Sequence, residues 1–119
     1  MKIAGIYGEK DMNLYNSAVA DLNKANVIFN DFVHYRNNGF TPLKPDAEMK
    51  VLLSPIAGLI LAALEKLDEM GKAVENFQYD TGSIKSRLSG LSARVEEQQN
   101  FLKRYLATPV PERVKLFYR

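Results

Sequence analysis

One long apolar stretch constrains the fold more than any other part of the sequence. Residues 51–77 begin as almost unbroken hydrocarbon and then settle into a one-sided stripe. The stripe steps by three and four residues and consists of Ile60, Ala63, Leu67, Met70, Val74 and Phe77. That spacing places side chains on one face of an α-helix. We therefore predict a central helix against which the other long segments pack.

The first half of this helix is apolar over a wider arc than one neighbouring helix covers. At about 100° per residue, the apolar side chains between residues 52 and 64 occupy roughly half of the circumference. Two neighbours, or one neighbour and another subunit, would cover that arc. The remaining face carries the small residues Ser54, Gly58 and Ala62. Such spacing admits a closely packed helix, and it equally suits a face turned to solvent or to a loop.

The apolar run does not predict a membrane span. Residues 51–64 fall short of the roughly 20 that a bilayer requires, and Glu65 and Lys66 follow at once. Pro55 leaves two ways to start the helix. The helix begins at Ser54 with proline in its first turn, or a helix capped by Asp46 is kinked at Pro55. We adopt the kinked helix, over residues 46–79.

Two further helices are predicted from the same spacing. Asp11 is a suitable N-cap and Gly39 a suitable stop for a helix over residues 11–38. Its stripe is Tyr15, Ala18, Leu22, Ala25, Phe29, Phe32 and Arg36. Residues 37–45, with Asn-Asn-Gly and two prolines, form a turn. After Gly82, with Ser83 as the cap, a helix over residues 84–107 carries the stripe Ile84, Leu88, Leu91, Val95, Gln98, Leu102 and Tyr105. Gln98 is its polar member, a device that can fix helix register.

These elements predict an all-α fold in a single domain over residues 1–119. Long helices joined by short turns should form an up-down-up antiparallel bundle with coiled-coil-like packing. The aromatic residues near the ends of the first and third helices then meet at one end. Residues 1–8 are expected to form a short strand or an ordered arm. The tail, residues 108–119, is expected to be a short helix or a strand.

The sequence offers no catalytic constellation. It contains no cysteine, which excludes disulfides and thiolate metal sites. His34 is the single histidine, and neither it nor the acidic residues Glu65, Asp68, Glu69, Glu96 and Glu97 supply the Glu-x-x-His pairs of a di-iron bundle. No phosphate-binding glycine loop is present. We predict no enzymatic activity, no cofactor, no metal and no small-molecule substrate. The N-terminus lacks a signal-peptide pattern, so we expect a cytoplasmic protein if Met1 is the natural start.

The predicted function is protein association, either with a protein partner or as a homodimer. The expected interaction residues come from the central helix and the tail: Leu52, Leu53, Ile56, Leu59, Ile60, Leu116, Phe117 and Tyr118. The alternative is a basic adaptor that binds nucleic acid or another polyanion through residues 85–119. Residues 81–119 hold eight Lys or Arg against three Glu. Nucleic acid is the less favoured partner because these cations face different directions on a helical wheel.

Overall fold

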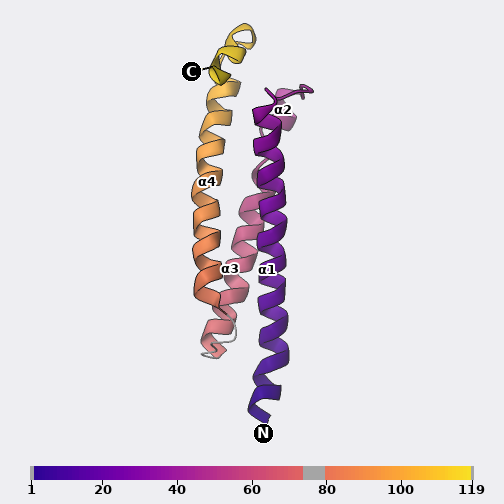
Figure 1. Ribbon diagram of the computed structural model, residues 1–119, viewed down its shortest axis with the longest axis vertical. Helices are drawn as coiled ribbons and strands as arrows, with labels where there is room; N and C mark the ends of the chain where they lie inside the picture. Colours follow the sequence, from indigo (N-terminus) through magenta and orange to yellow (C-terminus); the bar gives the residue numbers. More distant parts are fainter. Residues whose placement is uncertain (1, 74–79, 119) are drawn as a thin grey trace.

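The structure, a computed structural model, describes residues 2–73 and 80–118, and this part of the chain is helical without any strand (Figure 1). Helix α1 (Lys2–Asn37) runs from one end of the molecule to the other, and the short α2 (Asp46–Met49) follows. Helix α3 (Ser54–Ala73) returns, and α4 (Thr81–Ala107) runs parallel to α1 (Figure 1). A 3-10 helix, η1 (Val110–Phe117), ends the chain. The predicted up-down-up bundle is confirmed, in a molecule 68 Å long and 22 by 19 Å across.

The predicted N-terminal arm is wrong, because α1 already begins at Lys2. Asp11, the expected N-cap, lies inside the helix and is only 3% exposed. Residues 2–10 contain no proline, and their two glycines cost about 1 kcal/mol each in a helix. That cost is small enough for a helix of 36 residues to continue through them. Its first turns extend beyond the end of the bundle where α3 and α4 meet (Figure 1).

The single kinked helix over residues 46–79 is also wrong, because two helices occupy this stretch. Pro55 has no N–H, so the carbonyl of Val51 lacks its usual helical donor. Ser54 supplies donors instead, through its backbone N–H at 3.2 Å and its Oγ at 2.7 Å. The chain therefore turns at residues 50–53, and α3 starts at Ser54. This is the alternative in which the helix begins at Ser54 with proline in its first turn. Residues 74–79 of the predicted helix lie outside the described residues.

Helix α4 starts three residues earlier than predicted. The carboxylate of Asp80 accepts a hydrogen bond from the backbone N–H of Ser83 at 2.9 Å, so Asp80 is the N-cap. A carboxylate also suits the positive end of the helix dipole. Ser83 and Gly82, which we expected to cap and to turn, lie within the first turn of α4. The predicted end of this helix at Ala107 is confirmed.

Most of the core comes from the predicted stripes, and Phe40, Met49, Leu53 and Ile56 complete it. Leu22 and Phe32 of α1, Ile56 and Leu67 of α3, and Leu88 and Leu91 of α4 are all buried. Helices α1 and α3 pack together most extensively. A salt bridge between Lys66 Nζ and Asp21 Oδ2 at 2.6 Å joins these two helices. At the polar position of the α4 stripe, Gln98 Oε1 accepts a hydrogen bond from Arg36 Nη1 at 2.7 Å. This bond fixes α4 against α1.

Two leucines of α3 offer a matched test of the packing. Leu67 is fully buried and Leu61 is 58% exposed. We expect Leu67→Ala to lower the free energy of unfolding by about 2–5 kcal/mol. In the monomer, Leu61→Ala should change it by no more than about 0.5 kcal/mol, so unfolding is measured at concentrations too low for two copies to associate. Urea unfolding followed by circular dichroism measures both, and equal effects would show that the two faces of α3 are assigned wrongly.

Candidate functional site

A cluster of aromatic rings closes the end of the bundle where α1 and α4 end. Phe40 lies at its centre and is fully buried. Its ring centroid is 4.8 Å from that of Tyr105, 5.1 Å from Tyr35 and 5.5 Å from Phe117. The rings of Tyr105 and Phe117 meet Phe40 edge-on, an arrangement that aromatic pairs favour. We call Phe32, Tyr35, Phe40, Phe101, Tyr105 and Phe117 the aromatic cluster. The gathering of aromatic residues at this end was predicted, but without Phe40.

Phe40 reaches this position through the way α1 ends. Its backbone N–H bonds the carbonyl of Tyr35 at 2.9 Å, and the N–H of Gly39 bonds the carbonyl of Arg36 at 2.9 Å. With Gly39 at a φ of +68°, these two bonds form a Schellman motif. In that motif the residue after the glycine contacts a residue in the last turn, here Tyr35. An aromatic residue directly after the helix-ending glycine was therefore a signal in the sequence, and we missed it by treating residues 37–45 as a turn only.

The backbone of Phe40 is strained. Its φ is +57°, in the left-handed region, which costs a residue with a Cβ about 1–2 kcal/mol. Burying a phenylalanine side chain contributes about 1.5–3 kcal/mol. Burial therefore offsets the strain, and the loop keeps its shape because the ring is held in the cluster.

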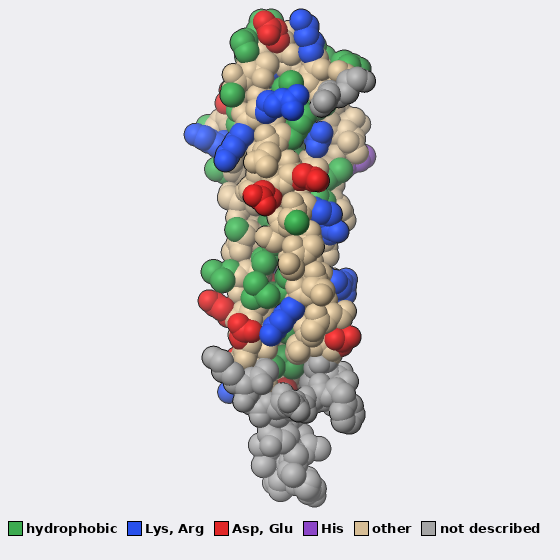
Figure 2. Space-filling view, turned by 90° about the vertical axis from the view of Figure 1, so that its left-hand side faces the viewer, with side chains coloured by type: hydrophobic (Ala, Val, Ile, Leu, Met, Phe, Trp, Pro, Cys, Tyr) green, Lys and Arg blue, Asp and Glu red, His purple; other side chains and the backbone are tan. Residues whose placement is uncertain are grey.

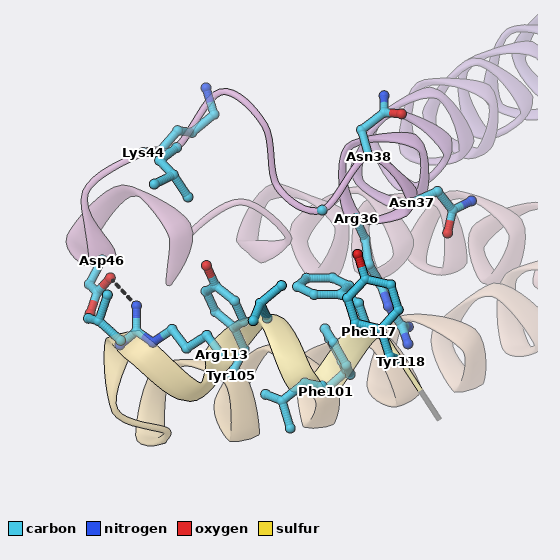
Figure 3. Close-up of a pocket in the computed structure, with 15 residues that line it drawn as sticks. Arg36, Asn37, Asn38, Lys44, Asp46, Phe101, Tyr105, Arg113, Phe117 and Tyr118 are labelled. Carbon is cyan, nitrogen blue, oxygen red and sulfur yellow. Dashed lines mark hydrogen bonds and ion pairs between the residues drawn. The ribbon is translucent and has the colours of Figure 1, made fainter.

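The tail folds back onto the same end of the bundle as a 3-10 helix, not a strand. Phe117 packs against Phe40, Phe101 and Tyr105. Arg113 donates to both carboxylate oxygens of Asp46, at 3.0 and 3.1 Å (Figure 3). Its guanidinium also donates to the backbone carbonyls of Thr108 and Leu106. Hydrogen bonding to Arg113 lowers the pKa of Asp46, and hydrogen bonding to Asp46 raises the pKa of Arg113. Asp46 thus binds the tail instead of capping a helix.

An open pocket of about 840 Å³ lies between the loop at residues 38–45 and η1 (Figure 3). Its volume is in the range of roughly 300–1,000 Å³ that is usual for ligand sites. Four apolar side chains that line it are strongly exposed: Leu43, Val110, Val114 and Tyr118. We call this cavity the end pocket.

Three cationic side chains, those of Arg36, Lys44 and Arg113, line the end pocket together with one acid, Asp46. The guanidinium of Arg36 lies over the ring of Phe101 at 3.7 Å, and its burial lowers its pKa. The amino group of Lys44 lies 5.4 Å from the ring centroid of Tyr35 and points outward from the rim (Figure 3). Residues 34–50 and 101–118 together hold seven Lys or Arg against three Asp or Glu. Lys and Arg side chains gather at this end of the face that Figure 2 shows.

The structure divides the predicted interaction residues between two places. Leu53, Ile56 and Ile60 are buried inside the bundle, and Leu52 and Leu59 are half-buried against it. Leu116 and Phe117 pack onto the core of their own chain, whereas Tyr118 is exposed at the end pocket. The apolar side chains that are exposed on the open face of α3 differ from the predicted interaction residues. They are Pro55, Ala57 and Leu61, with Gly58 between them, and Val51 in the turn before α3 is exposed as well.

The segment Asp46–Met70 has the length and composition of a membrane span, and it is the one such segment in the part of the chain that the structure describes. Those criteria are also met by the core helix of a soluble protein. Of the apolar window that meets these criteria, 28% is buried. Ile56, Ala63 and Leu67 of the segment are fully buried, and the backbone turns at residues 50–53. The described residues hold no group of three or more side chains arranged to bind a metal ion.

Comparison of the chain with family models, with curated proteins and with solved structures gives no match. The functional proposals below therefore rest on the geometry of this chain alone.

Replacing Phe40 tests whether the aromatic cluster holds this end together. We expect Phe40→Ala to lower the free energy of unfolding by about 3–5 kcal/mol, the range for a buried phenylalanine. Tyr118→Ala is the control, because this aromatic side chain is 75% exposed. Urea unfolding measures both, and a Phe40→Ala protein as stable as the control would contradict a buried ring.

The contact between Arg113 and Asp46 predicts a pKa that can be measured. In the native protein, carboxyl-carbon NMR should give Asp46 a pKa below the usual range for aspartate. At pH values above that pKa, the ion pair stabilises the docked tail. This stabilisation is lost as the pH falls through the pKa of Asp46. Arg113→Met should return the pKa of Asp46 toward its ordinary value. Arg104→Met, an exposed arginine near the end of α4, should leave it lowered. An Asp46 pKa that is insensitive to Arg113→Met would rule out this contact.

Proposed function

We propose that the protein is a non-enzymatic helical module for protein association, and that two copies pair through the open face of α3. The observation that supports this proposal is the apolar character of that face. Val51 and Leu61 are more than half exposed, and Pro55, Ala57 and Gly58 between them are exposed as well. An exposed apolar surface on a small domain is a common mark of an interaction site.

Gly58 gives the face a shape that suits a second helix. A Cβ added at Gly58 would meet no atom within 4 Å, so the packing of this chain does not require a glycine there. Glycine within a helix costs about 0.5–1 kcal/mol relative to alanine. Close approach of a partner helix would account for that cost, since small residues allow two helix backbones to come together.

The same face suits a second copy of this chain. Residues 51–64 carry no charge, so two such faces meet without leaving an unpaired ion between them. In a twofold dimer the same patch of both subunits forms the interface. Leu61 of one copy would then pack beside the small residues of the other.

Binding of a polyanion through residues 85–119 is the second candidate, and the excess of cations at the aromatic end supports it. Several cations of residues 85–119 already have intramolecular contacts. Lys85 pairs with Asp68 at 3.0 Å, Arg94 lies 5.6 Å from the ring centroid of Phe29, and Arg113 binds Asp46. We rank this candidate second because those contacts would compete with phosphate. Retention on heparin that falls steeply with salt would favour it.

Charge placed on the proposed interface should prevent pairing. Leu61 of α3 and Val27 of α1 are both 58% exposed, which makes them a matched pair. We expect light scattering to show a dimer at micromolar concentrations for the native protein and for Val27→Glu. Leu61→Glu should be monomeric at the same concentrations, because dimerisation would bury an unpaired carboxylate. A native protein that is monomeric throughout would refute the dimer.

A second test changes only the shape of the face. Gly58→Gln and Gly90→Gln place the same long polar side chain on two helices, where a Cβ meets nothing within 4 Å in either case. Both variants should keep or slightly raise stability, because glutamine is a better helix former than glycine. Only Gly58→Gln should weaken the dimer, measured as a dissociation constant by sedimentation equilibrium. Equal dissociation constants for the two variants would place the interface elsewhere.

A further inference from the structure

We infer that the end pocket is a docking site for a short acidic segment of a partner protein that carries apolar side chains among its carboxylates. This site is separate from the α3 face. The inference rests on the proposed function only in taking a protein as the partner.

The apolar part of such a segment has a place to bind. Leu43 lines the end pocket from the loop before α2, and Val110, Val114 and Tyr118 line it from the tail. Leu43 is 76% exposed and Val110 is 70% exposed, so both lose apolar contact with water when a side chain enters between them. The floor is preformed, because the aromatic cluster and the ion pair of Arg113 with Asp46 hold the two sides in place. Little ordering would therefore be needed on binding.

The charge of this end selects an acidic partner. The excess of cations over acids in residues 34–50 and 101–118 is four. The carboxyl ends of α1 and α4 lie at this end and contribute about half a negative charge each, or about one in total. The cationic excess is larger, so the field around the pocket favours carboxylates. Lys44 makes no ion pair with an acid among the described residues, and its amino group lies over the ring of Tyr35.

A peptide fits this surface better than a nucleic acid. A single-stranded nucleic acid needs exposed rings for its bases to stack on, in a groove of cations that follows its backbone. Here the rings of Phe40, Phe101 and Tyr105 are packed against each other, and Tyr118 is the one strongly exposed ring among the described residues that line the pocket. A single exposed ring gives successive bases no row of stacking partners.

Fluorescence anisotropy on the full-length protein tests this inference with a labelled peptide in which Asp and Glu alternate with Leu and Phe. We expect saturable binding that weakens as salt is added. Lys44→Glu should weaken it about tenfold, because reversing a rim charge turns attraction into repulsion. Lys24→Glu makes the same change at an exposed lysine of α1 and should have no effect. Leu43→Ser should also weaken binding about tenfold by removing an apolar contact, and Val27→Ser is its control.

Three further results decide the matter. A peptide with Lys in place of each acid, and a peptide with Ser in place of each Leu and Phe, should both bind at least about tenfold more weakly. Equal binding of either one would overturn the inference, and so would a Lys44→Glu protein with native affinity. A single-stranded DNA probe could also bind more tightly than the peptide and lose affinity in Lys44→Glu. That result would overturn the inference, because the ligand would then be a polyanion. Leu61→Glu should bind the peptide with native affinity, and Lys44→Glu should still form the dimer. Failure of this inference is therefore distinguishable from failure of the proposed function.

Discussion

The ring of Phe40 brings three segments that are far apart in sequence to one point of the bundle. It contacts Tyr35 in the last turns of α1, Tyr105 near the end of α4, and Phe117 in η1. The left-handed backbone at Gly39 and Phe40 turns the chain so that this ring points inward. Burial of the ring offsets the cost of that backbone. The loop, the tail and the pocket between them therefore depend on one side chain.

The two ends of the bundle differ because of this cluster. Large rings fill the space between α1 and α4 at the aromatic end. Further along, α1 contributes small residues such as Ala18 and Ala25 to the core, and the helices pack with aliphatic side chains such as Leu88 and Leu91. Rigid packing at the aromatic end suits a preformed pocket. The open face of α3, with Gly58 at its middle, suits contact between helices. The molecule thus presents two surfaces of different chemistry, one basic and concave and the other uncharged.

Much of this fold could be predicted from the spacing of apolar residues. The stripes through Leu22, Leu67 and Leu91 gave the three long helices, their order and their buried faces correctly. Boundaries were less predictable, because local hydrogen bonds decide them. Asp80, and not Ser83, is the N-cap of α4, and Pro55 lacks the N–H donor that a continuous helix would need. Periodicity carries no information about either contact.

The candidate site was less predictable than the fold. The gathering of aromatic residues at one end followed from the up-down-up order. The central position of Phe40 in the cluster could not be predicted from that order, because a residue within a turn belongs to no periodic stripe. The pairing of Arg113 with Asp46 spans 67 residues and depends on the tail folding back. The exposure of Leu61 on α3 and of Val51 in the preceding turn was less predictable for a related reason. The stripe identifies the buried face of a helix and leaves its exposed face undefined.

Nuclear Overhauser contacts between aromatic rings test the central claim most directly. The account predicts cross-peaks in solution from the ring protons of Phe40 to those of both Tyr105 and Phe117, whose centroids lie 4.8 and 5.5 Å away. Cross-peaks from Phe117 to its sequence neighbours alone would show that the tail is not docked. That result would contradict both the aromatic cluster and the pocket built on it.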